Sequence, residues 1–199
     1  MTVSNKINRR PFVAALLAQR GNALVVPGLG SPTWDCSAAG DSPEYLYSWG
    51  GMGLAVPTAL GLALARPERR VLALTGDGEM LMGIGSLATI GVQQPPNLTL
   101  VVIDNERYGE TGMQETHTAH GVDLAGVARA CGFKYSKTTS SLKTLRSIIH
   151  EGAGPNFAVV KVIAEKLPLV LPPLDGVALK DRFRRALLGD SAEVLSQKR

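Results

Sequence analysis

Two short polar segments each follow a strongly apolar stretch and carry oxygen atoms that could bind a cation. Gly76-Asp77-Gly78 follows residues 71–75, and Asp104-Asn105 closes the stretch 98–103. Carboxylate and amide oxygens are the ligands that Mg²⁺ or Ca²⁺ prefers, whereas zinc favours nitrogen and sulfur. Mg²⁺ takes one or two carboxylates from a protein and completes its coordination with phosphate oxygens and water. These residue types therefore predict a divalent cation that links the chain to a phosphorylated ligand.

Apolar stretches and helical patterns alternate along the chain and predict the elements that hold these segments. The continuous stretches 71–75 and 98–104 are typical of strands buried on both faces of a parallel sheet. The alternation predicts an α/β fold with a doubly wound, mostly parallel sheet and helices on both faces. Ligands bind at the carboxyl ends of the strands in such sheets, where both polar segments fall.

The same patterns predict the remaining elements. We expect helices over residues 10–20, 54–65, 85–92, 124–131, 140–150 and 177–187, and strands over 23–26, 133–136 and 157–163. We expect one domain over residues 1–165, followed by a C-terminal extension over 166–199 that carries a basic helix.

Composition excludes several classes of protein. The chain has 199 residues, of which 45% are hydrophobic and 19% charged, so a disordered chain is excluded. Cys36 and Cys131 are too few for a disulfide framework or a four-cysteine zinc site, which suggests a reduced, cytoplasmic setting. The net charge is +4, without an aromatic-interleaved basic patch, and no apolar stretch approaches the ~20 residues of a membrane span. We therefore expect neither nucleic-acid nor membrane binding.

The two polar segments together resemble the signature of thiamine diphosphate enzymes, in which Gly-Asp-Gly is followed by Asn. Leu60-Gly61, Pro67, Leu72 and Leu74 also keep the spacing of that family's upstream frame. The resemblance covers roughly residues 20–165 and implies the thiamine diphosphate-binding fold. The chain is most similar to the β subunits of sulfopyruvate and phosphonopyruvate decarboxylases.

The resemblance implies roles for individual residues. Asp77, Asn105 and the backbone carbonyl of Arg107 would ligate Mg²⁺, and Met52 would support the thiazolium ring of thiamine diphosphate. The implied cofactor-binding residues are Gly50, Gly51, Met52, Gly76, Asp77, Gly78, Glu79, Asn105, Tyr108 and Gly109. The sequence departs from the family pattern at Glu79, where the family usually has a small residue. It departs again at Asp104, which replaces the first of two asparagines.

The resemblance also implies a partner and a reaction. This chain has no room for the second domain, which holds the aminopyrimidine of the cofactor and supplies a glutamate. We therefore expect a pyrimidine-binding α subunit in an α₂β₂ or larger hetero-oligomer, with activity only in the complex. The reaction would decarboxylate a small anionic 2-oxo acid to CO₂ and an aldehyde. A lid over residues 108–121 would contribute catalytic side chains from Glu115, His117 and His120, with a transition-metal cluster as the alternative for these three.

Three other functions stay open. One is an acetolactate-synthase-like carboligase subunit, and another is a non-catalytic subunit with the same fold. The third is a nicotinamide-binding module, because residues 83–88 match a loose G-x-G-x-x-A pattern with Asp104 about 20 residues later. These glycines lie at least five residues after the strand, whereas a dinucleotide fingerprint needs them in the strand-to-helix turn.

Overall fold

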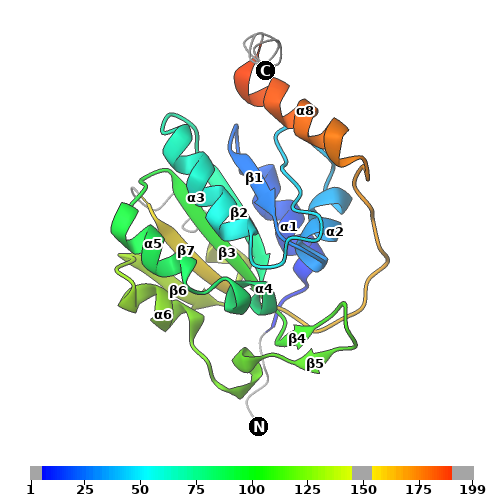
Figure 1. The fold of residues 1–199 in the computed structure, drawn as a ribbon. Coiled ribbons are helices and arrows are strands. Elements are labelled where there is room, and N and C mark those ends of the chain that lie inside the picture. The colour runs from blue at the N-terminus through cyan, green and yellow to red at the C-terminus, as the bar shows by residue number, and fades with distance from the viewer. Residues whose placement is uncertain (1–5, 145–153, 190–199) are drawn as a thin grey trace.

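A five-stranded, fully parallel sheet forms the centre of the computed structural model, which describes residues 6–144 and 154–189 (Figure 1). The strand order is β1-β2-β3-β7-β6. The bounds are β1 Leu24–Pro27, β2 Val71–Gly76, β3 Leu98–Asp104, β7 Asn156–Lys161 and β6 Tyr135–Thr139. The predicted doubly wound α/β fold is confirmed.

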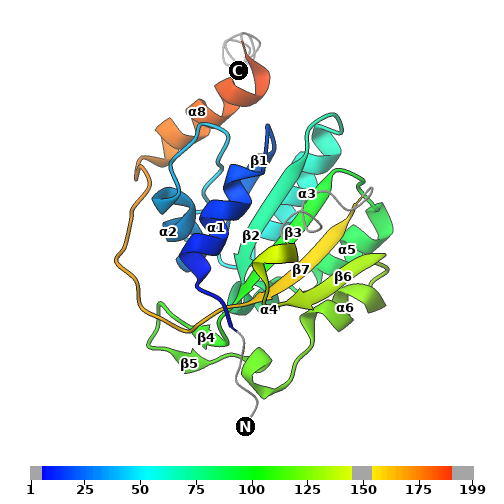
Figure 2. The same ribbon diagram turned by 180° about the vertical axis from the view of Figure 1, so that it is seen from behind.

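Helices cover both faces of the sheet, because side chains along each strand alternate between two cores. Leu100 and Val102 of β3 point into the core under α3 (Ala55–Ala65), α5 (Ser86–Gln93) and α6 (Leu124–Ala130). Val101 and Ile103 point into the core under α1 (Arg9–Ala18) and α2 (Ser31–Ala38). Figures 1 and 2 show these two helical layers from opposite sides.

Two helices were not expected from the sequence, and both lie at the carboxyl edge of the sheet. Helix α4 (Asp77–Met82) begins directly after β2, so Gly76-Asp77-Gly78 forms the strand-to-helix junction instead of a longer loop. Helix α2 begins after Gly30, whose positive φ of 74° turns the chain out of the loop after β1. Most of the helix expected over 140–150 lies outside the described residues, beyond a short 3-10 turn, η2 (Leu142–Thr144).

The segment between β3 and α6 runs along the carboxyl edge of the sheet. It contains a two-stranded antiparallel hairpin, β4 (Arg107–Tyr108) and β5 (Gln114–Glu115), and a 3-10 helix, η1 (His117–His120). Residues 108–121, expected above as a lid, are called the lid segment below.

After β7 the chain runs as a strap, residues 163–175, past the hairpin to the last helix, α8 (Gly176–Leu188). Leu179 and Phe183 of α8 are buried in the two cores, so this helix packs onto the domain. The division at residue 165 stays a prediction. Among residues 6–144 and 154–189, no helix combines the length and apolar character that crossing a membrane requires.

Candidate cofactor and metal site

The register of the sheet brings the two polar segments together. Strands β2 and β3 are hydrogen-bonded neighbours in which Gly76 is aligned with Ile103, so Asp77 and Asn105 follow the paired strand ends. Both side chains are buried, with residue exposures of 2% and 8%, and both residues line one cavity at the carboxyl edge. The juxtaposition expected from the sequence is therefore present.

Asp77 is held from one side by two threonines of the lid segment. Thr116 Oγ1 donates to Asp77 Oδ2 at 2.5 Å, and Thr118 Oγ1 donates to the same oxygen at 3.2 Å. Burial raises the pKa of Asp77 to about 6, although the hydrogen bond from Thr116 opposes this shift. Among the described residues, both side-chain hydrogen bonds to Asp77 end on Oδ2, so no side chain donates to Oδ1.

The donor set at the strand ends fits Mg²⁺. Asp77 offers a carboxylate oxygen, and Asn105 offers an amide oxygen that accepts a hydrogen bond from the backbone of Arg107 at 3.0 Å. This bond turns the chain beyond Asn105, so Arg107 also lines the cavity. A single carboxylate with neutral oxygens suits a cation that also binds phosphate oxygens. Across the described ranges, no group of three or more His, Cys, Asp or Glu could hold a metal.

Asp104 has a different role from Asn105. Its Oδ2 forms an ion pair with Lys161 Nζ at 2.7 Å, and its Oδ1 accepts from Thr118 Oγ1 at 2.8 Å. Its residue exposure is 1%, and it is absent from the described residues that line the cavity. Asp104 therefore anchors the end of β3 to β7 and to the lid segment.

Gly78 and Tyr108 form one wall of the cavity by close contact. A Cβ atom on Gly78 would lie 2.4 Å from Cε1 of the Tyr108 ring, a separation that side chains do not tolerate. Only glycine therefore fits beneath the ring, and the backbone of Gly78 stays open to the cavity. Gly109 lines the same cavity directly after Tyr108.

Glu79, the departure from the family pattern, is buried at 5% exposure between β1 and β2. Its Oε2 accepts a hydrogen bond from Thr75 Oγ1 at 2.8 Å. A Cβ on Gly28 would lie 1.7 Å from Oε2, so the carboxyl group fills the space that a glycine leaves at the end of β1. Burial raises the pKa of Glu79, and the bond from Thr75 opposes this shift.

Met52 reaches the cavity from a glycine-rich turn before α3. Gly50 and Gly53 have positive φ angles of 68° and 84°, which bend the chain on either side of Met52. Met52 lines the cavity, whereas Gly50 and Gly51 shape the turn without being among the described lining residues. Their roles in cofactor binding stay predictions.

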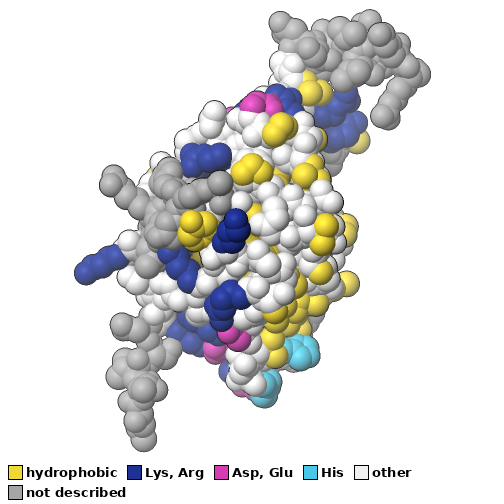
Figure 3. Space-filling view, turned by 90° about the vertical axis from the view of Figure 1, so that its left-hand side faces the viewer, with side chains coloured by type: hydrophobic (Ala, Val, Ile, Leu, Met, Phe, Trp, Pro, Cys, Tyr) yellow, Lys and Arg dark blue, Asp and Glu magenta, His cyan; other side chains and the backbone are white. Residues whose placement is uncertain are grey.

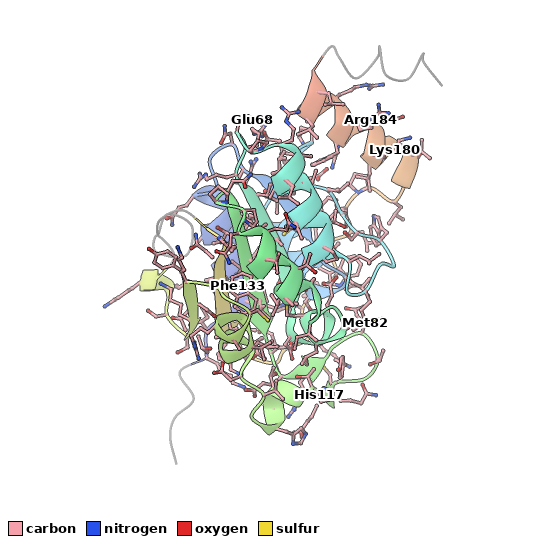
Figure 4. The ribbon with its side chains drawn as sticks, turned by 60° about the vertical axis from the view of Figure 1, so that its left-hand side comes forward. Glu68, Met82, His117, Phe133, Lys180 and Arg184 are labelled. Carbon is pink, nitrogen blue, oxygen red and sulfur yellow. The ribbon has the colours of Figure 1, made fainter. Side chains whose placement is uncertain are left out.

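The predicted catalytic side chains lie apart from this cavity. His117 and His120 are exposed on η1, and Glu115 pairs with His120 Nε2 at 3.2 Å and with Arg107 at 2.9 Å. None of Glu115, His117 and His120 is among the described residues that line the cavity. Figure 4 shows His117 at the lower end of the molecule, away from Lys180 and Arg184 on α8. Their catalytic role stays a prediction.

Three parts of the site were not predicted from the sequence. Thr116 and Thr118 carried no signal, because isolated threonines are common in loops. The first turn of α2 lines the cavity with Gly30, Ser31 and Pro32, and proline within the first helical turn is a signal that could have revealed it. Arg9, in the first turn of α1, also lines the cavity although it is far away in the sequence.

The glycines of the nicotinamide alternative lie elsewhere. Gly83 and Gly85 join α4 to α5, whereas β2 ends at Gly76 and passes directly into α4 at Asp77. The glycines of residues 83–88 therefore do not lie between a strand and the helix that follows it, where a dinucleotide site requires them.

Known proteins match both the sequence and the fold. The model of the thiamine pyrophosphate enzyme C-terminal TPP-binding domain matches residues 35–162. The sulfopyruvate decarboxylase subunit beta of Methanothermobacter thermautotrophicus is 37% identical over 166 residues, covering 83% of this chain and 88% of the relative. The phosphonopyruvate decarboxylase of Streptomyces viridochromogenes is 40% identical over 124 residues, covering 62% of this chain and 31% of that longer protein.

A solved structure supports the fold independently. The thiamine diphosphate-dependent 4-hydroxybenzoylformate decarboxylase of Rhodococcus jostii superposes with a TM-score of 0.67 at 19% identity. The match covers 84% of this chain and 34% of that one. The family model and the 37% identical relative agree: the chain belongs to the thiamine pyrophosphate enzymes and is related to the sulfopyruvate decarboxylase beta subunits.

Proposed function

We propose that this chain binds the diphosphate of thiamine diphosphate through Mg²⁺ and serves as the β subunit of a two-subunit decarboxylase of small anionic 2-oxo acids. The observation that carries the proposal is the pair Asp77 and Asn105, buried side by side on neighbouring strand ends in one cavity. The aldehyde and CO₂ would be the products.

The residues around this pair have distinct roles in the proposal. Asp77, Asn105 and the carbonyl of Arg107 hold the cation, and Thr116 keeps the Asp77 carboxylate oriented towards it. The open backbone of Gly78 lets the diphosphate approach closely, and Met52 supports the ring system. When bound, thiamine diphosphate supplies the group that accepts the electrons of the breaking carbon–carbon bond. The protein contributes placement and exclusion of water.

A pyrimidine-binding α subunit completes the site in this proposal. The related proteins named subunit beta imply a partner. Next to Met52, Leu54 and Met82 are 55% and 67% exposed, and Met82 lies against the turn at Gly53. Figure 3 shows hydrophobic side chains gathered along one side of the molecule above the histidines, and Figure 4 places Met82 on the lower part, as it does His117. An apolar surface that continues from the cavity suits the partner that covers the cofactor.

The substrate class follows from the relatives and from the site. The related proteins are named for sulfopyruvate and phosphonopyruvate, both 2-oxo acids with a second acidic group. His117 and His120, on the exposed η1, would reach the substrate as proton donors only if the lid segment closes over the cavity. Activity with pyruvate in which two molecules join, with release of one CO₂, to a longer 2-hydroxy-3-oxo acid would instead indicate a carboligase subunit.

The test is reconstitution. The full chain is mixed with candidate α subunits in the presence of Mg²⁺ and thiamine diphosphate, and CO₂ release is measured with sulfopyruvate, phosphonopyruvate and pyruvate. We expect release only from the mixture, and loss of release with Asp77→Ala. Full activity of the Asp77→Ala mixture would contradict the proposal, and Glu68→Ala, on the remote surface, is the matched control (Figure 4).

A further inference from the structure

Two arginines share one buried carboxylate beside the cavity. Arg9 Nε contacts Asp35 Oδ2 at 2.7 Å, and Arg10 Nε contacts Asp35 Oδ1 at 2.9 Å. Asp35 is fully buried, and Arg9 is 3% exposed. One carboxylate neutralises only one of the two guanidinium groups, so this cluster keeps an excess positive charge.

The two arginines are oriented by equivalent contacts but face different surroundings. Arg9 Nη1 donates to the carbonyl of Glu165, and Arg10 Nη2 donates to the carbonyl of Pro168, each at 2.8 Å, so both hold the strap. Only Arg9 is among the described residues that line the cavity. Within residues 6–144 and 154–189, its Nη2 makes no hydrogen bond that the structure shows.

The cavity wall around Arg9 favours an anion at this position. Gly30, Ser31 and Pro32 line the same cavity, and the first intrahelical bond of α2 runs from Trp34 N to the carbonyl of Gly30. The amide of Ser31 therefore precedes the hydrogen-bonded turns and lies at the positive end of the helix. A buried guanidinium with a free nitrogen pairs best with an oxyanion that accepts two hydrogen bonds.

The other charged side chains that line the cavity are less suited than Arg9 to bind an anion. Arg107 is paired with Glu115 at 2.9 Å. The carboxylates of Asp77 and Glu79 would repel an anion unless a cation intervened, and Glu110 accepts a hydrogen bond from the indole of Trp34. Among the charged lining residues that the structure describes, Arg9 is buried and belongs to a cluster, formed with Arg10 and Asp35, whose net charge is positive.

We propose that Arg9 binds a phosphoryl or sulfonyl oxyanion in the cavity. This inference rests on the proposed function, which supplies two sources for the oxyanion: the diphosphate tail of the cofactor and the second acidic group of the substrate. Arg9 would thereby add a binding contact that neither the strand-end ligands nor the lid segment provides.

The experiment compares Arg9→Gln with Arg10→Gln in the full chain mixed with its partner subunit. Both variants lose one bond to Asp35 and one strap carbonyl, so damage to the cluster or the strap affects them alike. The dissociation constants of thiamine diphosphate with Mg²⁺ and of inorganic pyrophosphate are measured by tryptophan fluorescence. The KM values of sulfopyruvate and pyruvate are measured in parallel, and thermal melting records folding.

We expect Arg9→Gln to weaken one of these ligands about 10- to 100-fold, as the loss of a hydrogen bond to a charged group does, and Arg10→Gln to stay within about twofold of wild type. If the dissociation constants of both thiamine diphosphate and pyrophosphate rise, the oxyanion is the cofactor's. If only the KM of sulfopyruvate rises, while that of pyruvate does not, it is the substrate's.

Equal effects of Arg9→Gln and Arg10→Gln on every ligand would overturn the inference. Should Arg9→Gln not fold, Arg9→Lys keeps the charge and the bond to Asp35 but loses the second nitrogen, and wild-type affinities in that variant would overturn it too. A wild-type complex that binds no thiamine diphosphate would contradict the proposed function. A wild type that binds it, with an unaffected Arg9→Gln, would contradict only the role of Arg9.

Discussion

The proposed metal ligands at the strand ends, Asp77 and Asn105, lie a few ångströms from the lid segment, yet the two regions are built in opposite ways. Asp77 and Asn105 are buried and fixed by the register of two adjacent parallel strands. The lid segment exposes His117 and His120, and it reaches the strand ends through the buried hydroxyl groups of Thr116 and Thr118 and through the Tyr108 ring over Gly78.

This contrast indicates which function each region can perform. Groups that hold a charged cofactor need fixed geometry, which a central sheet supplies because its strands cannot move independently. Groups that meet a substrate can lie on a segment with fewer buried contacts, because such a segment can open and close. We therefore expect substitutions at the strand ends to change cofactor affinity and substitutions on η1 to change turnover.

The largest effect is expected from Asp77→Ala. Removing the carboxylate deletes the charged ligand of the cation, so the affinity for thiamine diphosphate with Mg²⁺ should fall more than about 100-fold. Asp77→Asn, which keeps the shape, should lose affinity similarly, while the metal-free chain should melt no lower than wild type because a buried charge has been removed. Titration calorimetry and thermal melting check both parts. Unchanged affinity in either variant would place the cation elsewhere.

Gly78→Ala should have the next largest effect. The new Cβ would collide with the Tyr108 ring, at 2.4 Å, and either the ring or the α4 junction must shift. We expect about 1–3 kcal/mol of lost stability, as for other overpacked sites, and about tenfold weaker cofactor binding. Denaturant unfolding measures the first quantity. The double variant Gly78→Ala with Tyr108→Ala should recover stability relative to the sum of the single changes, and strict additivity would argue against this contact.

Thr116→Val tests the connection between the two regions. The variant keeps the shape but leaves Asp77 Oδ2 without its closest hydrogen bond, which has a length of 2.5 Å. Loss of a hydrogen bond to a charged group should weaken Mg²⁺-dependent cofactor binding about tenfold. Thr116→Ser, which retains the hydroxyl group, is the matched control and should behave like wild type. If both variants bind the cofactor equally well, the lid segment does not orient the ligand.

The smallest effect on binding is expected from His117→Ala and His120→Ala. Because both side chains are exposed and absent from the described cavity wall, cofactor affinity should stay within about twofold of wild type. A proton donor among them would show as a lowered kcat with unchanged cofactor affinity in steady-state kinetics of the complex. A large loss of cofactor affinity would contradict the expectation that substitutions on η1 change turnover and leave cofactor binding unchanged.

Much of the fold could be predicted because its signals are local. The apolar stretches before Asp77 and Asn105 are long and continuous, and such stretches suit buried parallel strands. Helix α4 was missed because its six residues carry no full amphipathic repeat, and its first residues belong to a Gly-Asp-Gly segment that favours a turn. Strand β6 begins at Tyr135, two residues later than expected, because the amide of Phe133 still donates to the carbonyl of Ala128 in α6, at 3.1 Å.

Only those site residues that follow a predicted strand could be placed from the sequence. Asp77 and Asn105 follow adjacent strands, so their proximity follows from topology alone. The contact of Arg9 with Asp35 joins residues 26 apart on two helices, and Thr116 reaches Asp77 across 39 positions. Such pairs depend on how helices and loops pack, which no local pattern encodes.

The central claim is that one cation joins Asp77 and Asn105 to a diphosphate. Crystals of the complex grown with thiamine diphosphate and Mn²⁺, which takes the same oxygen ligands as Mg²⁺, allow the metal to be located by its anomalous scattering. We predict one peak within coordination distance of a side-chain oxygen of each residue, in contact with the diphosphate. A peak at Glu115, His117 and His120, or a diphosphate bound away from β2 and β3, would contradict the account.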